Sequence, residues 1–255
     1  MPILNSTTRF SSRVGNYVRY RPGYPPEVLQ TLQTECALSS RSAIADVGSG
    51  TGFLAKLFLE NGNQVYGVEP NKEMREAGEN FLRGFPNFIS VAATAETTTL
   101  PPRSVDFISA GQAAHWFDAK KARMEFARIL KPGGWVVLVW NDRETDATPL
   151  LAEYESLLEA YCPEYAEVRT KGLAASKVER FFSPAPMRVG TFPSHQVFDY
   201  QGLEGRLLSS SYSPPADDPK RQPMLQELRR IFDRYQVGGR VTFDYDTRMY
   251  YGQVG

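Results

Sequence analysis

Short apolar runs alternate with amphipathic stretches over the first 140 residues of the chain. Buried parallel strands have this apolar character, and the runs predict five strands, at 42–45, 64–68, 88–93, 105–110 and 135–140. Helical spacing of apolar residues predicts helices between them, over 53–59, through Met74 and Ala77, and over 120–129. The alternation of strands and helices predicts a mostly parallel sheet with helices on both faces.

The second half of the chain is less regular. Helical spacing predicts helices over 150–161, 203–210 and 224–235, and Gly238-Gly239 ends the last of them. Apolar and polar residues alternate over 187–200 and 240–250, which we expect to pair as antiparallel strands. Two further segments predict irregular structure, a loop over 211–219 and a turn at Lys131-Pro132-Gly133-Gly134, just before the fifth strand.

The run Asp46-Val47-Gly48-Ser49-Gly50-Thr51-Gly52 joins the first predicted strand to a helix. Glycine adopts positive φ and lets the backbone approach a ligand, and the helix start offers unpaired N–H groups, so the run predicts a nucleotide-binding turn. Dinucleotide folds use GxGxxG beneath a pyrophosphate, whereas the spacing here is GxGxG. A carboxylate at Asp46 would repel a pyrophosphate but would accept hydrogen bonds from a cationic amino-acid group.

Glu69 stands at the end of the second predicted strand, followed by Pro70 and Asn71. An ionised carboxylate offers two acceptor oxygens to the vicinal hydroxyls of a ribose. NAD enzymes share this feature, so Glu69 alone does not distinguish between nucleotides. Asn71 is a suitable cap for the helix that follows.

Composition excludes several classes of protein. The 255 residues hold 29 basic and 29 acidic side chains, so the chain has no net charge. Its composition therefore does not favour a nucleic acid or a membrane surface as partner. We expect no membrane span, no signal peptide and a cytoplasmic location. Cys36 and Cys162 lack a CxxC pattern and are expected to be buried thiols, and no metal site is expected. With 42% hydrophobic residues, the chain is expected to fold as a single domain over 1–255, as a monomer or homodimer.

Four segments together resemble the class I S-adenosylmethionine-dependent methyltransferases, within the type 11-like group. They are Asp46–Gly52, Gly67–Met74, Ala95-Glu96 with Leu100-Pro101, and Arg128–Gly134. The rest of the chain resembles a narrower branch that includes trans-aconitate methyltransferase-like proteins. That similarity rests on Arg19-Tyr20-Arg21-Pro22, Tyr24-Pro25 and Gly111–Phe117.

The resemblance implies a Rossmann-like seven-stranded mixed sheet, with five parallel strands, a C-terminal antiparallel pair and helices on both faces. It implies a cofactor-binding core at about 40–142, an N-terminal cap over 1–39 and a substrate side over 143–255. The implied cofactor is S-adenosylmethionine. Its methionine part would contact Asp46, Gly48, Ser49 and Gly50, its ribose Glu69, its adenosine side Pro70, Asn71 and Met74, and its adenine Ala95 and Glu96. Gln112 would lie near the sulfonium and carboxyl end, and Tyr17 and Arg21 would close over the cofactor.

The acceptor side is less defined by the sequence. A sulfonium methyl is already activated, so the protein mainly aligns a small-molecule acceptor for in-line attack. A carboxylate acceptor is already ionised near neutral pH, whereas a hydroxyl or amine needs a base, for which His115 is the candidate. An equally open interpretation is that His115 orients its loop or packs on Trp116.

Other side chains are candidates for the acceptor pocket. They are Trp116, Tyr212 and Arg248, and a tricarboxylate acceptor would draw on Arg21, Arg206 and Arg248. Two alternatives to an enzyme of this class remain open. One is a non-catalytic protein that binds S-adenosylmethionine or S-adenosylhomocysteine, and the other is a nicotinamide-dependent oxidoreductase.

Overall fold

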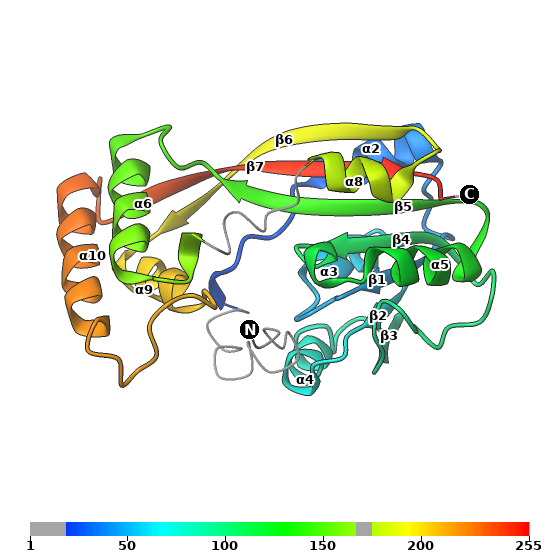
Figure 1. Ribbon diagram of the computed structural model, residues 1–255, viewed down its shortest axis with the longest axis horizontal. Coiled ribbons are helices and arrows are strands. Elements are labelled where there is room, and N and C mark those ends of the chain that lie inside the picture. Colours follow the sequence, from blue (N-terminus) through cyan, green and yellow to red (C-terminus); the bar gives the residue numbers. More distant parts are fainter. Residues whose placement is uncertain (1–18, 167–174, 255) are drawn as a thin grey trace.

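The computed structural model describes residues 19–166 and 175–254 of the chain (Figure 1). Within these residues, seven strands form one sheet in the order β3-β2-β1-β4-β5-β7-β6. The strands are β1 Ala43–Val47, β2 Gln64–Val68, β3 Phe88–Val91, β4 Val105–Gly111, β5 Leu130–Arg143, β6 Met187–Phe198 and β7 Val241–Gly252. Neighbours among β1 to β5 pair in parallel, and β7 pairs antiparallel with both β5 and β6. The expected mixed seven-stranded sheet is confirmed, including the antiparallel C-terminal pair.

The helices that connect and flank the strands mostly match the sequence pattern. They are α2 Pro26–Cys36, α3 Phe53–Glu60, α4 Lys72–Phe81, α5 Ala119–Ile129, α6 Pro149–Tyr161, α8 Ala175–Phe182, α9 Tyr200–Leu208 and α10 Arg221–Tyr235, with a short 3₁₀ helix η2 at Ala114–Trp116. The predicted cap at Asn71 is confirmed, because its side chain accepts a hydrogen bond from the Met74 amide at 2.8 Å. Two of these helices, α2 and α8, were not predicted.

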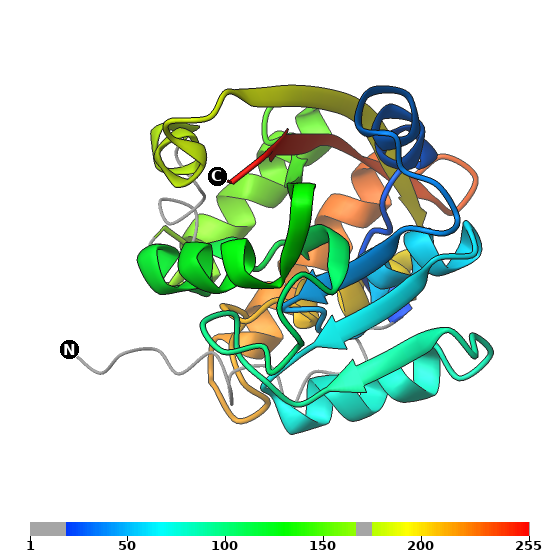
Figure 2. The same cartoon turned by 90° about the vertical axis from the view of Figure 1, so that its right-hand side faces the viewer.

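Helices cover both faces of the sheet (Figure 2). On one face, α5 and α8 bury apolar side chains such as Phe126 and Phe182 against β4 and β5. On the other, α2 and α3 bury Leu32 and Phe58 in a second cluster. Both thiols are buried as predicted, Cys36 in this second cluster.

A third apolar cluster lies beyond this sandwich. Helices α6, α9 and α10 pack together against one end of β6 and β7, at the left of Figure 1. Tyr154 of α6 and Phe243 of β7 are both buried there, with ring centroids 4.7 Å apart. We call the group formed by α6, α9 and α10 the helical annex.

The start of the fifth strand was predicted wrongly. We expected a turn at 131–134 and a strand from 135, whereas β5 begins at Leu130 and continues to Arg143. On β4, Val105 pairs with Leu130 and Phe107 pairs with Trp135, so the four residues 131–134 have no register partner on β4. The turn residues therefore interrupt the ladder inside the strand. The C-terminal extension exists because β7 pairs with β5 as far as Arg143.

Candidate functional site

The glycine turn follows β1 and lies against the end of β2. The amides of Gly48 and Ser49 donate to the Val68 carbonyl at 2.8 and 3.1 Å. Gly48 and Gly50 have φ values of 67° and 56°, which favour glycine. A Cβ on Gly48 would lie 2.5 Å from the Cβ of Ala113, so no other residue fits there.

Asp46 is completely buried directly before this turn. Its Oδ1 accepts a hydrogen bond from the Ser109 hydroxyl at 2.8 Å, whereas Oδ2 has no hydrogen-bond partner within the described part of the chain. Burial raises the pKa of this carboxyl to about 7. A buried acceptor without a partner is costly, and a ligand that donates to Oδ2 would remove that cost.

Glu69 ties the end of β2 to the glycine turn. Its Oε2 accepts from the Gly50 amide at 2.9 Å and its Oε1 from the Asn71 amide at 2.8 Å. Burial raises the pKa of Glu69, and these two amide donors offset only part of that effect. The carboxylate thus has a fixed orientation at the carboxyl ends of the strands.

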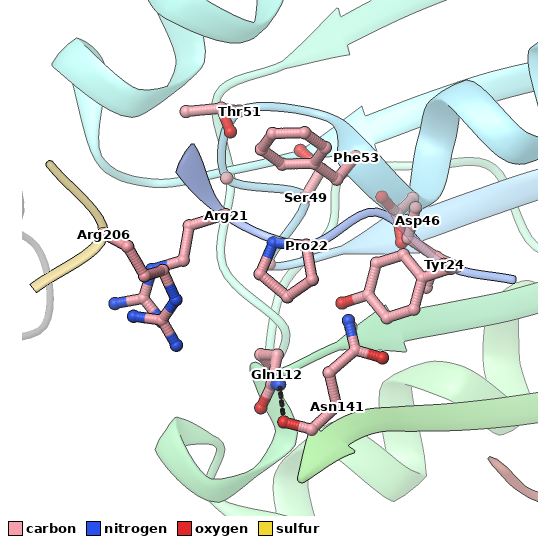
Figure 3. A pocket seen from close by; sticks show the side chains of 14 residues that line it. Arg21, Pro22, Tyr24, Asp46, Ser49, Thr51, Phe53, Gln112, Asn141 and Arg206 are labelled. Atoms are coloured by element: carbon pink, nitrogen blue, oxygen red, sulfur yellow. Dashed lines mark hydrogen bonds between the residues drawn. The ribbon is translucent and has the colours of Figure 1, made fainter. Parts of the chain in front are cut away.

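Two pockets meet at this edge of the sheet. We call the first the arginine pocket, because Arg21 and Arg206 line it together with Asp46, Ser49 and Asn141 (Figure 3). We call the second the glutamate pocket, because Glu69 and Glu96 line it. Gly48, Gly50, Gly111 and Gln112 line both pockets. The pockets therefore share a wall at the switch point between β1 and β4, where open α/β sheets bind ligands.

The structure brings together most of the residues that the sequence assigned to a cofactor. The arginine pocket holds Arg21, Asp46, Gly48, Ser49, Gly50 and Gln112, and the glutamate pocket holds Glu69, Pro70, Asn71, Met74, Ala95 and Glu96. Glu96 also accepts a hydrogen bond from the Asp118 amide at 2.9 Å. Tyr17 lies outside the described residues.

Gln112 stands where the two pockets join. Its backbone is left-handed, with φ of 57°, an uncommon conformation for a residue other than glycine. The amide of Gln112 donates to the Val139 carbonyl at 2.9 Å, and its Nε2 donates to the Asn141 carbonyl at 3.0 Å. These contacts fix the loop after β4 against β5, and such strain is frequent at functional sites.

Of the residues expected around an acceptor, Trp116 lines the glutamate pocket. His115 belongs to η2 and stacks on Trp116, with ring centroids 4.8 Å apart, but it is not among the described residues that line either pocket. Desolvation by the surrounding protein lowers the pKa of His115 to about 4, although part of the residue is exposed. The expected stacking on Trp116 is present, and the role of a base stays a prediction.

Neither Tyr212 nor Arg248 is among the described residues that line the two pockets. Tyr212 packs on Tyr165 in the annex, with ring centroids 4.9 Å apart. Arg248 is exposed on β7, where its Nε lies 3.7 Å from Asp142 Oδ2. Of the three arginines considered for an anionic acceptor, the structure brings Arg21 and Arg206 together and leaves Arg248 apart.

Among the residues of the arginine pocket that sequence reasoning did not assign to the site are Tyr24 and Asn141. Asn141 donates to the Gly23 carbonyl at 3.0 Å and accepts from the Thr247 hydroxyl at 2.7 Å. These contacts join β5, β7 and the segment before α2, which are far apart in sequence. The position of Asn141 directly after a predicted apolar strand was the one local signal, and the contacts themselves come from tertiary structure.

The fold, the GxGxG turn and the buried glutamate after β2 define the class I S-adenosylmethionine-dependent methyltransferases. Comparison with known proteins agrees, because residues 45–138 match the family described as Methyltransferase domain. Over residues 45–138 the chain is therefore similar to the methyltransferases of this class, whose cofactor is S-adenosylmethionine.

Individual relatives extend the similarity to different degrees. An uncharacterized methyltransferase of Mycobacterium tuberculosis is 39% identical over 135 residues, which are 53% of this chain and 53% of that protein. The chain thus matches about half the length of this relative. An uncharacterized methyltransferase of Schizosaccharomyces pombe is 26% identical over 246 residues, which are 94% of this chain and 95% of that protein. The structure of a proposed type II methyltransferase from Anaeromyxobacter dehalogenans has a TM-score of 0.67 at 22% identity, covering 92% of this chain and 98% of that one. That likeness concerns the fold.

Proposed function

We propose that this protein transfers a methyl group from S-adenosylmethionine to a small-molecule acceptor that carries a carboxylate. The observation that supports this most strongly is the meeting of the two pockets at Gly48, Gly50 and Gln112. The glutamate pocket offers groups for the cofactor's nucleoside. The arginine pocket offers Asp46 and Arg21 to its amino-acid end and Arg206 to an acceptor, so the reacting pair would meet near the shared wall.

The residues present fit the proposed cofactor. Asp46 has a buried oxygen in need of a donor, which the cofactor's ammonium group provides. Glu69 offers its carboxylate to the ribose hydroxyls, and the apolar contacts of Met74 and Ala95 suit an adenine. Arg21 is placed for the cofactor's carboxylate. When bound, the cofactor supplies a methyl group attached to a sulfonium. The thioether formed on transfer is a leaving group that needs no further activation.

A carboxylate acceptor is consistent with the charges around the arginine pocket. Guanidinium groups recognise carboxylates in bidentate geometry, and with Arg21 assigned to the cofactor, Arg206 is the second guanidinium that lines this pocket. An ionised carboxylate needs no proton removed before attack, so the protein would act by alignment and exclusion of water. The position of His115 outside the pocket walls agrees with this mode of action.

Calorimetry and a transfer assay test the proposal. We expect S-adenosylmethionine and S-adenosylhomocysteine to bind and NAD not to bind. With isotope-labelled methyl, we expect transfer into an acidic small-molecule fraction of a cell extract, with the product identified by mass. Binding of NAD in place of the sulfonium nucleoside would show an oxidoreductase, and binding without transfer into any fraction would show a binding protein. Transfer into a fraction without acids would disprove the carboxylate acceptor.

A further inference from the structure

Arg206 of the helical annex is a buried cation that the annex does not neutralise. Only 7% of the residue is exposed. Its Nη1 donates to the Ser210 hydroxyl at 3.2 Å, whereas its Nε has no hydrogen-bond partner among residues 19–166 and 175–254. In the same residues, no carboxylate forms an ion pair with Arg206. Burial of a charge without a partner is costly, so the protein keeps Arg206 at an energetic cost.

The immediate surroundings of Arg206 supply no negative charge. The groups that interact with it electrostatically are the phenols of Tyr154, Tyr212 and Tyr245. A phenol is neutral near pH 7 because its ordinary pKa is about 10. The dipoles of the tyrosine hydroxyls can therefore orient the guanidinium, and the rings can pack against the stem of Arg206, but they do not compensate its charge.

Arg143, at the end of β5, shows how the protein treats a structural arginine that faces the annex. Arg143 forms an ion pair with Glu155 and also donates to the Tyr165 hydroxyl at 3.3 Å. Its guanidinium lies over the Tyr154 ring, 4.9 Å from the centroid. Two buried arginines thus share Tyr154 as a neighbour, and only Arg143 has a carboxylate partner. The missing partner of Arg206 is a property of that position and not of the annex as a whole.

Arg206 does face a space that could hold an anion. Its side chain enters the arginine pocket from α9, while Arg21 enters from the N-terminal segment (Figure 3). The proposed cofactor has one carboxylate, for which Arg21 is the assigned partner. From this we infer that Arg206 binds an anionic group, a carboxylate or a phosphate, of the methyl acceptor and so determines which acceptors are accepted. This inference rests on the proposed function and deepens it.

The annex is held in the position that this role needs. A Cβ on Gly205 would overlap the ring of Tyr20, so α9 approaches the N-terminal segment closely only because residue 205 is glycine. Arg21 donates from Nη2 to the Ser209 carbonyl at 3.3 Å, and Gln196 donates to the Tyr20 carbonyl at 3.4 Å. The Ser209 contact fixes the end of α9 beside the segment that carries Arg21, and the Gln196 contact ties β6 to the same segment, which keeps Arg206 at the pocket.

Binding of small anions to the S-adenosylhomocysteine complex tests the inference. The probes are succinate, its uncharged analogue succinamide, and inorganic phosphate, each titrated into wild type, Arg206→Met, Arg206→Lys and the surface control Arg248→Met. We expect one of the anions to bind wild type and Arg248→Met, and succinamide to bind neither. Arg206→Met should weaken the anion at least about tenfold, with Arg206→Lys in between, while S-adenosylhomocysteine affinity changes less than about twofold. Preference for succinate or for phosphate identifies the anionic group.

Three results would overturn the inference. They are equal anion binding by wild type and Arg206→Met, a loss of S-adenosylhomocysteine binding that accompanies the loss of anion binding, and no binding of either anion by wild type. Thermal melting confirms that each variant is folded, and Arg206→Lys keeps the cation if Arg206→Met does not fold. Failure of the proposed function would appear differently, as a wild-type protein that transfers no methyl group. With active wild type, an unchanged KM for the extract acceptor in Arg206→Lys and Arg206→Met would reject the role of Arg206 alone.

Discussion

The carboxyl edge of the parallel strands and the helical annex bury charges of opposite sign. At the strand edge, Asp46 and Glu69 are buried carboxylates, held by a serine hydroxyl and by backbone amides. In the annex, Arg206 of α9 is buried, and beside it the guanidinium of Arg143, at the end of β5, is largely removed from solvent. The wall of the arginine pocket therefore changes from anionic at Asp46 to cationic at Arg206. This difference in charge would orient a cofactor that carries an ammonium group and an acceptor that carries a carboxylate.

The two regions also differ in how their polar groups are fixed. The Glu69 carboxylate is held by two backbone amides, that of Gly50 in the glycine turn, 19 residues away in sequence, and that of Asn71. Arg206 is placed by the packing of α9 against the rest of the annex and against Tyr20. Changes at the strand edge should thus act on cofactor binding, and changes in the annex on stability or acceptor choice. The following predictions test this division.

The largest effect is expected from breaking the ion pair between Arg143 of β5 and Glu155 of the annex. Arg143→Met removes the cation paired with the buried Glu155, which keeps the Tyr165 hydroxyl as a hydrogen-bond donor, so we expect the free energy of unfolding to fall by about 3 kcal/mol. Urea denaturation measures this. The matched change Arg206→Met removes a buried cation that has no carboxylate partner and should cost less than about 1 kcal/mol or stabilise the protein. Equal destabilisation by the two changes would mean that Arg206 is a structural residue like Arg143.

Glu69→Gln tests the strand edge. A glutamine side chain accepts hydrogen bonds less strongly than a carboxylate, both from the backbone N–H groups of Gly50 and Asn71 and from the proposed ribose. We expect S-adenosylmethionine to bind about thirtyfold more weakly, which corresponds to about 2 kcal/mol. Calorimetry measures the affinity, with exposed Glu73→Gln on α4 as the control. An affinity that Glu69→Gln leaves intact would remove Glu69 from the proposed cofactor site.

Asp46 makes stability depend on pH. Its pKa is raised from 3.8 to about 7 in the folded protein, so folding favours the protonated form. That contribution is complete below about pH 4 and is lost as pH rises through about 7. Between pH 5 and pH 8, we expect Asp46→Asn to gain about 1 to 2 kcal/mol of unfolding free energy relative to wild type. Urea denaturation at both pH values measures the difference, and a difference that does not vary with pH would contradict the raised pKa.

The strand edge could be predicted from sequence because its geometry is local. Asp46, the three glycines of the turn and Glu69 lie at the ends of apolar runs, and parallel strands bring such ends to one edge. The annex could not be predicted in the same way. Leu203 and Leu207 indicated part of α9, but the helix starts at Tyr200 because Asp199 caps it, accepting from the Gly202 amide at 2.7 Å.

The position of Arg206 depends on contacts that no short pattern contains. Its pocket joins α9 to Asp46 of β1, Asn141 of β5 and the N-terminal segment, each of which lies more than 60 residues from Arg206 along the chain. The sequence could name Arg206, Arg21 and Arg248 as candidates of equal standing. Only the packing of the annex separates them, since Arg248 faces away on β7. Residue type predicted the chemistry there, and tertiary structure selected the residue.

The smallest effect is expected at His115, and its size distinguishes the kinds of acceptor. With a pKa of about 4, the imidazole is a weak base at neutral pH, and it does not line either pocket among the described residues. If the acceptor is a carboxylate, no proton needs removal, and His115→Ala should lower kcat by less than about threefold through its packing on Trp116. Labelled-methyl transfer with the identified acceptor measures kcat. A true general base contributes about a hundredfold or more, so a loss of that size would favour a hydroxyl or amine acceptor over a carboxylate.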